Sequence, residues 1–218
     1  MSSLVDAADA RARMVERQLR RRGITDERVL EAMGHVPREL FLPEALRAYA
    51  YEDGALPIGY RQTISQPFIV ATICSLLALE GPERVLDVGT GSGYQAAVLA
   101  ELAAEVVTIE RIPELAAEAQ AALEQAGYAN VEVRVGDGSL GVPERAPFDA
   151  IAVAAAAPTL PPALYAQLAV GGRVVVPRGS RWGQDLVLVV RTPDGPVERR
   201  SIPCRFVPLL GDEGFVDD

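Results

Sequence analysis

Apolar and polar residues follow a helical period in the N-terminal part of the chain. Over residues 4–33 apolar side chains recur at intervals of three and four, with a break at Gly23. The triplet Thr-Asp-Glu at 25–27 is typical of a helix start, so we expect two consecutive helices here. Prolines and glycines then interrupt the pattern to about residue 62, and Gln66–Leu79 predicts a third helix with a strongly apolar face.

From residue 84 onward, short apolar runs alternate with helix-length segments. The runs predicted as strands are Arg84–Val88, Val106–Glu110, Val131–Val135, Phe148–Val153 and Arg173–Pro177. The segments predicted as helices are Gly93–Ala103, Pro113–Gln125 and Pro162–Leu168. This alternation predicts an α/β fold with a doubly wound, mostly parallel sheet flanked by helices. Leu186–Arg191 and Val197–Ile202 flank a Thr-Pro-Asp-Gly turn, which predicts an antiparallel hairpin at one end of the sheet.

The composition excludes several kinds of chemistry. The 218 residues carry 21 basic and 30 acidic side chains, a net charge of −9, and every basic residue is arginine. Without lysine there is no Schiff-base nucleophile, and with His35 as the one histidine we expect no metal site. The negative charge argues against nucleic-acid binding, and no apolar run is long enough to span a membrane. We expect Cys74 and Cys204 to be buried free thiols of a cytoplasmic protein.

The segment 85–93, Val-Leu-Asp-Val-Gly-Thr-Gly-Ser-Gly, runs from a strand into a glycine loop that opens a helix. Glycine suits such a loop because the backbone turns sharply and a ligand can approach without meeting a Cβ atom. One frame, Gly91-x-Gly93-x-x-Ala96, matches a dinucleotide-binding pattern and leaves an NAD-dependent enzyme as an alternative. The other frame, Gly89-x-Gly91-x-Gly93, follows the strand directly and is preceded by Asp87.

Three acidic residues lie at the ends of successive predicted strands. Asp87 and Glu110 end the first two, and Asp137 follows the third within Gly-Asp-Gly. Because ligands bind at the carboxyl ends of strands in open α/β sheets, the three should surround one cleft. Carboxylates repel a pyrophosphate but suit a cationic ligand with hydroxyl and amine donors, such as S-adenosylmethionine (SAM). We expect Glu110 to accept from the ribose hydroxyls and Asp137 from the adenine amine. The pattern resembles SAM-dependent methyltransferases over roughly residues 84–177, and this resemblance implies a Rossmann-like fold.

The segment Leu56–Pro67 adds a second motif, which ends in Gln-Thr-Ile-Ser-Gln-Pro. Local chemistry alone explains Ser65 as the N-cap of the following helix, with Pro67 in the first turn. The whole motif, however, resembles the protein-L-isoaspartate(D-aspartate) O-methyltransferase family. The other matching stretches are Val36–Glu39, Val85–Gly93, Gly136–Gly138, Ala146–Ile151 and Arg205–Leu209.

This resemblance implies a repair activity on damaged proteins. SAM would methylate the α-carboxylate of an L-isoaspartyl residue, or the side-chain carboxylate of D-aspartate, and leave S-adenosylhomocysteine (SAH). The ester would close to a succinimide, which hydrolyses in part to L-aspartate. An aspartate O-methyltransferase of the same family that tailors one dedicated peptide remains an alternative, as does a SAM-binding module without catalysis.

The resemblance also assigns site residues. Ser65 would align the reacting carboxylate, and Thr63 and Val207 would bind the substrate main chain. The residues expected at the cofactor are Gln66, Pro67, Phe68, Ile69, Asp87, Gly89, Gly91, Gly93, Glu110, Asp137 and Gly138.

The chain is expected to form one domain over 1–218. Its parts are the N-terminal helices with the active-site segment (1–80), the cofactor-binding core (81–180), and the C-terminal strands and tail (181–218). We expect a monomer whose partners are isoaspartyl peptides, with His35 on the surface and Trp182 anchoring a loop.

Overall fold

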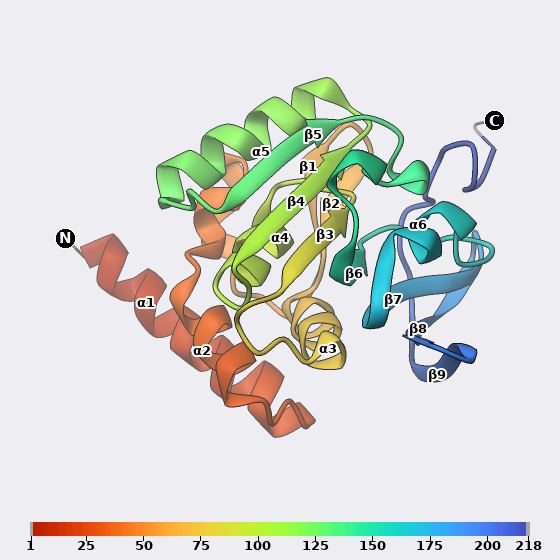
Figure 1. Ribbon diagram of the computed structural model, residues 1–218. Helices are drawn as coiled ribbons and strands as arrows, with labels where there is room; N and C mark the ends of the chain where they lie inside the picture. The colour runs from red at the N-terminus through yellow and green to blue at the C-terminus, as the bar shows by residue number, and fades with distance from the viewer. Residues whose placement is uncertain (1, 217–218) are drawn as a thin grey trace.

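The computed structural model of the protein describes residues 2–216, with side chains from residue 7 onward. Met1 and Asp217–Asp218, the ends of the predicted domain, lie outside the described residues. One seven-stranded sheet organises this part of the chain, with strand order β5-β4-β3-β6-β7-β8-β9 (Figure 1). The strands are β3 (Arg84–Val88), β4 (Glu105–Glu110), β5 (Val131–Val135), β6 (Phe148–Val153), β7 (Leu168–Ser180), β8 (Gly183–Thr192) and β9 (Gly195–Cys204).

The first five strands of the sheet run parallel, and β8 and β9 add an antiparallel edge. The predicted fold class and hairpin are therefore confirmed. The predicted strands β3, β5 and β6 have the observed bounds, whereas β7 is much longer than Arg173–Pro177 because its ends pair with β6 and β8.

The helices form after the breaks that the sequence indicates. They are α1 (Ser2–Met14), α2 (Glu27–His35), α3 (Pro67–Leu77), α4 (Tyr94–Ala100), α5 (Pro113–Ala126) and α6 (Pro162–Gln167). Asp26 caps α2 by accepting from the backbone N–H groups of Arg28 and Val29. Between α1 and Gly23 the chain continues as a π-helical turn, Val15–Leu19, and a 3₁₀ turn, Arg20–Arg22, which the periodicity did not predict.

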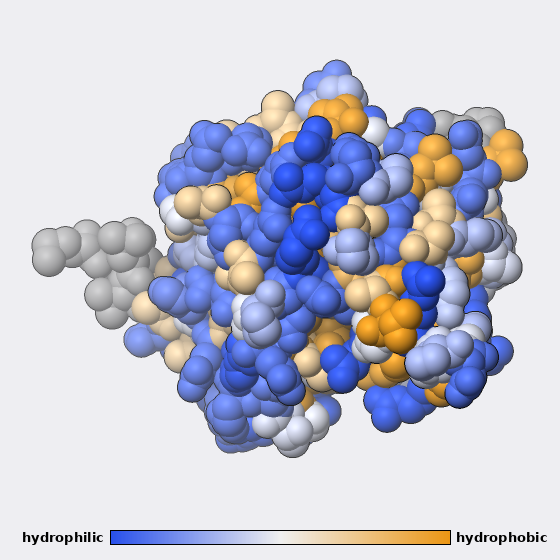
Figure 2. All heavy atoms as spheres, viewed as in Figure 1, coloured by the Kyte–Doolittle hydropathy of each residue, from blue (hydrophilic) through white to orange (hydrophobic). Residues whose placement is uncertain are grey.

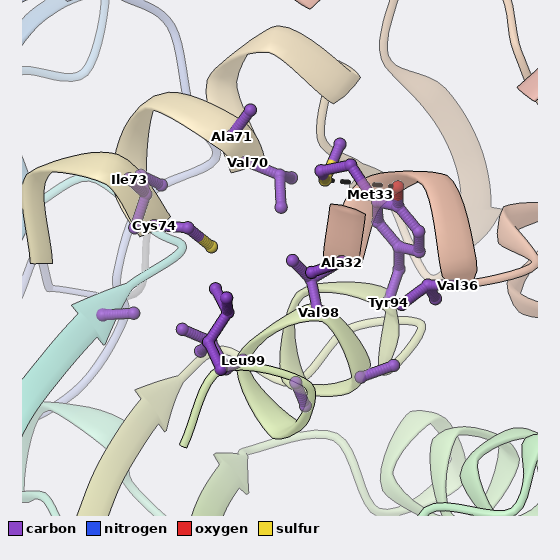
Figure 3. Close-up of a cluster of buried hydrophobic side chains, with 14 of the residues drawn as sticks. Ala32, Met33, Val36, Val70, Ala71, Ile73, Cys74, Tyr94, Val98 and Leu99 are labelled. Carbon is purple, nitrogen blue, oxygen red and sulfur yellow. Dashed lines mark hydrogen bonds between the residues drawn. The ribbon is translucent and has the colours of Figure 1, made fainter. Parts of the chain in front are cut away.

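Apolar residues on opposite faces of the sheet enter two separate cores, as the side-chain alternation of strands requires. Val85 and Val106 face the core that α2 to α5 cover, whereas Leu86 and Val107 face the core under α6 and the C-terminal segment. Figure 3 shows the first core, where the side chains of Met33 from α2, Cys74 from α3 and Tyr94 from α4 point into the space between these three helices. The Tyr94 hydroxyl donates to the Met33 sulfur at 3.6 Å.

A small hairpin precedes α3 in the stretch that the sequence left irregular. Its strands are β1 (Leu56–Gly59) and β2 (Gln62–Ile64), joined by Tyr60 and Arg61. Both turn residues have positive φ, 49° and 59°, a conformation in which asparagine and glycine are the usual residues. The turn therefore lacked its ordinary sequence signal, and the hairpin was missed.

Candidate active site

A cleft of about 860 Å³ opens at the carboxyl end of β3 and β4. Four segments that are distant in sequence line it: residues 62–65 of the small hairpin, 89–92 of the glycine loop, 109–112 at the end of β4, and 207–210 near the C-terminus. A concave site at the carboxyl edge of a parallel sheet is where open α/β folds bind their ligands.

The glycine loop takes its shape from three residues with positive φ: Gly89 at 92°, Gly91 at 53° and Gly93 at 88°. The N–H of Gly89 donates to the Ile109 carbonyl at 2.9 Å, which ties the loop to β4. Gly89 and Gly91 line the cleft, whereas Gly93 packs away from it. A Cβ atom at Gly93 would lie 3.3 Å from Leu123 of α5, so this glycine permits close helix packing.

Glu110, at the end of β4, is fixed at the cleft wall by the backbone. Its Oε2 accepts from the N–H of Gly91 at 2.9 Å, and its Oε1 accepts from the N–H of Ile112 at 3.1 Å. A carboxylate offers about four lone-pair sites, so each oxygen keeps one for a ligand hydroxyl. Although Glu110 is buried, it lines the cleft as the sequence predicts.

Asp87 lies below the cleft floor. It is fully buried and accepts from Gln95 Nε2 at 2.8 Å and from Thr108 Oγ1 at 2.9 Å. The pKa of Asp87 is raised to about 6, chiefly by burial and to a smaller extent by the negative charge of Glu110. The two hydrogen bonds oppose this rise. Asp87 therefore reaches the cleft through Gln95, which lines it, rather than through its own oxygens.

The small hairpin brings Thr63 and Ser65 to the same cleft as the glycine loop. Its backbone is held from behind by Arg38, whose side chain is completely buried. The Arg38 guanidinium donates to the Ser65 carbonyl at 2.9 Å and to the Ala50 carbonyl at 2.8 Å, and lies 4.7 Å from the ring centre of Tyr94. Burial lowers the pKa of Arg38, because removal from water disfavours the charged guanidinium, against the opposing effect of Tyr94 and Tyr51.

Several predicted site residues take other positions. Ser65 is not a helix cap: the N-cap of α3 is Gln66, which makes no side-chain capping bond and donates instead to Asp53 at 2.7 Å. The Arg22 guanidinium carbon lies over the Phe68 ring, 3.8 Å from the centre of that ring. Neither Gln66, Pro67, Phe68 nor Ile69 lines the cleft, and the wall of α3 is formed by Val70.

Gly138 and Val207 line the cleft, but Asp137 does not. The Asp137 carboxylate accepts from the backbone N–H groups of Ser139 and Asp212, each at 2.8 Å, and from the Ser139 hydroxyl at 2.7 Å. Its side chain is thus directed into contacts with the C-terminal segment.

Other lining residues had weaker sequence signals. Tyr94 and Gln95 belong to the first turn of α4, directly after the glycine loop, and Arg111 follows Glu110. All three lie within two positions of a predicted cofactor residue, Gly93 or Glu110, so closeness to a motif was the sequence signal that could have identified them. Leu209 and Leu210 also line the cleft. Leu209 ends the stretch Arg205–Leu209 that resembles the family, whereas Leu210 lies just beyond it and had no sequence signal.

Outside the cleft, two expectations have different outcomes. His35 is exposed, and its Nδ1 lies 3.1 Å from a Glu101 carboxylate oxygen, so the surface position is confirmed. Trp182 is 80% exposed at the turn between β7 and β8, so its prediction as a loop anchor is wrong. The turn is held instead by Arg181, which lies over the Phe215 ring.

The described residues contain two free cysteines, Cys74 and Cys204. Cys74 is buried as predicted, but the prediction is wrong for Cys204, which is only half-buried in the edge strand β9. Burial raises the pKa of both thiols, that of Cys204 to about 11. Across residues 2–216 there is no group of three or more potential metal ligands, and none of the helices is long and apolar enough to cross a membrane. The face in Figure 2 is mainly hydrophilic, with small hydrophobic patches between polar side chains.

The parallel sheet, the glycine loop after its first strand and the acid at the end of the next strand define a Rossmann-like methyltransferase. The sequence profile of the protein-L-isoaspartate(D-aspartate) O-methyltransferase family matches residues 10–214. The chain belongs to this family.

Named relatives agree with this assignment. Protein-L-isoaspartate O-methyltransferase 2 of Marinobacter nauticus is 58% identical over 96% of this chain and 97% of its own length. Protein-L-isoaspartate O-methyltransferase 1 of Syntrophobacter fumaroxidans is 55% identical over 97% and 99%.

Solved structures show the same fold. A protein-L-isoaspartate O-methyltransferase superposes with a TM-score of 0.84 at 31% identity, covering 94% of this chain and 67% of that one. A Plasmodium falciparum protein described as a putative member of the family, in complex with SAH, has a TM-score of 0.80 at 26% identity, covering 92% and 98%.

Proposed function

We propose that this protein repairs damaged proteins by transferring a methyl group from SAM to the α-carboxylate of L-isoaspartyl residues and to the side-chain carboxylate of D-aspartyl residues. One observation carries the proposal: the hairpin segment with Thr63 and Ser65 lines the same cleft as the glycine loop and Glu110. Substrate-side and cofactor-side motifs of the family therefore meet in the same cavity.

The residues of the cleft fit SAM. Glu110 keeps free lone pairs beside Gly91, and Ile109 and Ala154 add apolar wall. The negative charge of Glu110 would repel a pyrophosphate, but it suits a cofactor that carries a positive charge and hydroxyl donors. We propose that the cofactor is held directly by the lining residues Gly89, Gly91, Glu110 and Gly138. Asp137, which neighbours Gly138 but does not line the cleft, would reach the cofactor only through its remaining lone pair, while Asp87, Gly93, Gln66, Pro67, Phe68 and Ile69 shape the surrounding backbone.

When bound, SAM supplies a methyl group activated by the adjacent sulfonium. The protein contributes position rather than base strength, because a carboxylate with an ordinary pKa near 4 is already ionised at pH 7. The Ser65 hydroxyl would donate to one oxygen of the substrate carboxylate and leave the other oxygen free as the nucleophile. Thr63 and the backbone at Val207 hold the peptide main chain, and the cleft removes water from the nucleophile.

The methyl ester can expel methoxide, a far better leaving group than the oxide that a free carboxylate would have to lose. The neighbouring backbone nitrogen therefore attacks the ester carbonyl, methanol leaves with the nitrogen's proton, and a succinimide forms. Hydrolysis of the succinimide returns part of the material to L-aspartate. Both later steps occur on the released peptide and require no residue of this chain.

We propose that the three predicted parts of the chain act as one domain, supported by the cleft, to which each part contributes residues. The proposal includes a monomer that acts on isoaspartyl peptides and does not bind nucleic acid or membranes. It also includes a cytoplasmic location, supported by the two free thiols.

The test is methyl transfer to matched isoaspartyl and aspartyl peptides. We expect ester formation on the isoaspartyl peptide alone. Ser65→Ala should lower kcat about 10- to 100-fold, since a hydrogen bond to a charged group contributes about 1.5–3 kcal/mol, and should leave SAH affinity within about twofold. Ser75→Ala in α3, outside the cleft, is the matched control and should keep kcat. Equal methylation of both peptides, or methylation of neither, would contradict the proposal.

A further inference from the structure

The C-terminal segment 207–213 lines one side of the cleft with residues 207–210 and is not part of the seven-stranded sheet. Its start is fixed by two backbone bonds: the N–H of Ala156 donates to the Val207 carbonyl at 2.8 Å, and the N–H of Leu209 donates to the Ala156 carbonyl at 2.7 Å. Beyond Leu210 the chain leaves the cleft wall, and its path depends on contacts with the loop after β5.

Asp137 makes the main contact of that loop with the segment. Its Oδ2 accepts from the N–H of Asp212, while its Oδ1 accepts from the N–H and hydroxyl of Ser139. Ser139 is fully buried, and its hydroxyl oxygen also accepts from the N–H of Glu213 at 3.0 Å. The Glu213 carboxylate in turn accepts from the N–H of Ala163 in α6 at 2.7 Å. A continuous chain of hydrogen bonds therefore joins the loop, the segment and α6.

Gly211 permits this contact. An added Cβ atom at Gly211 would lie 2.0 Å from Asp137 Oδ1 and 2.6 Å from Oδ2. The φ angle of Gly211 is outside the left-handed region, so the absence of a side chain, rather than backbone conformation, is what this position requires. Because Asp137 is short and holds three donors, an alanine at 211 must displace either the carboxylate or the segment.

The Asp137 carboxylate has enough acceptor sites to bind both the C-terminal segment and a ligand. Burial acts to raise its pKa, but the hydrogen bonds from Asp212 and Ser139 and the charge of Arg111 lower it below the ordinary value. Three of about four lone-pair sites are occupied by the chain, which leaves one on Oδ2. The neighbouring Gly138 lines the cleft.

We propose that Asp137 is a positioning residue that holds the C-terminal segment over the peptide side of the cleft, in addition to its expected contact with the cofactor. This inference rests on the proposed function, because it assigns Val207 and its neighbours to peptide binding. One carboxylate thereby contacts the cofactor and also fixes the C-terminal segment that forms the peptide side of the cleft.

The experiment compares Asp137→Asn and Gly211→Ala with the wild-type protein by hydrogen–deuterium exchange without cofactor. Asparagine keeps one acceptor oxygen but presents an NH₂ group to the N–H of Asp212. We expect backbone amides of 211–215 to exchange at least tenfold faster in both variants. Gly183→Ala is the matched control, because a Cβ atom there meets nothing within 4 Å, and exchange should stay unchanged. Unchanged protection of 211–215 in both variants would overturn the proposal.

Kinetics separate positioning from simple loss of stability. With Gly211→Ala, the KM for an isoaspartyl peptide should rise about tenfold, while kcat at saturating peptide stays within about twofold. In an Asp137→Ala background the added methyl group has room, so Gly211→Ala should have no further effect. If Asp137→Asn weakens SAH binding but leaves peptide KM unchanged, Asp137 serves the cofactor alone and the proposal is wrong. The exchange result does not depend on methyl transfer, so it stands apart from a failure of the proposed function.

Discussion

Replacement of Asp87 by asparagine tests the cost of a carboxylate buried under the cleft. Asparagine has nearly the same shape and can satisfy both neighbours: its oxygen accepts from Gln95, and its NH₂ donates to Thr108. The Thr108 hydroxyl can then donate to Thr90, whose oxygen lies 2.7 Å away. The substitution therefore removes the negative charge while it keeps the hydrogen-bond network.

The magnitude follows from the pKa of Asp87. Burial, opposed by the bonds from Gln95 and Thr108, raises this pKa from 3.8 to about 6. Each pKa unit corresponds to about 1.36 kcal/mol, so ionised Asp87 lowers the free energy of unfolding by about 3 kcal/mol. The folded state binds this proton more tightly than the unfolded state. The favourable contribution of protonated Asp87 is therefore complete below about pH 4 and is lost as the pH rises through about 6.

Urea denaturation of cofactor-free protein between pH 4.5 and 8 measures this effect. We expect the free energy of unfolding of Asp87→Asn, relative to wild type, to increase by about 2 kcal/mol across this range, because about 1 kcal/mol of the effect is already present at pH 4.5. Asp194→Asn, in the exposed turn between β8 and β9, is the control and should show no such trend. A constant difference between Asp87→Asn and wild type, within about 0.5 kcal/mol, would refute the reasoning.

Two further substitutions examine the cleft. Glu110→Gln leaves one acceptor oxygen for the N–H groups of Gly91 and Ile112, so calorimetry should show an SAH affinity about 10- to 100-fold lower than that of wild type. Glu198→Gln at the surface is the control, and its SAH affinity should be unchanged. Equal SAH affinity of Glu110→Gln and wild type would contradict the assignment of Glu110 to cofactor binding. Arg38→Met removes the donor to the buried Ala50 carbonyl and the donor to the half-buried Ser65 carbonyl, at about 1–3 kcal/mol each, so its urea midpoint should fall clearly. A midpoint equal to that of wild type would show that Arg38 does not support the Ser65 backbone.

Local patterns predicted the sheet well where a strand is short, apolar and bounded by breakers. Arg84–Val88 and Phe148–Val153 have their predicted bounds because both lie inside the sheet, where nearly every position is buried. The extension of β7 to Leu168–Ser180 depends on partners on either side, which periodicity does not contain. The β1–β2 hairpin was missed because Tyr60 and Arg61 occupy turn positions usually filled by asparagine or glycine.

The candidate site divides in the same way. The glycine loop and Glu110 belong to one continuous strand–loop–helix–strand unit, so their spacing along the chain places them together at the cleft. Arg38 showed no local sign of its role, because an arginine is ordinarily exposed and only the packing around Tyr94 encloses it.

The sequence by itself therefore determined the α/β architecture, the family and the residues at which the cofactor is expected. These properties depend on periodicity and on motifs within short stretches of chain. Only the tertiary structure decided that Asp87 lies beneath the cleft and that Asp137 contacts the C-terminal segment about 75 positions later. The physical reason is that a carboxylate takes its role from the donors and the solvent around it, and distant segments supply both.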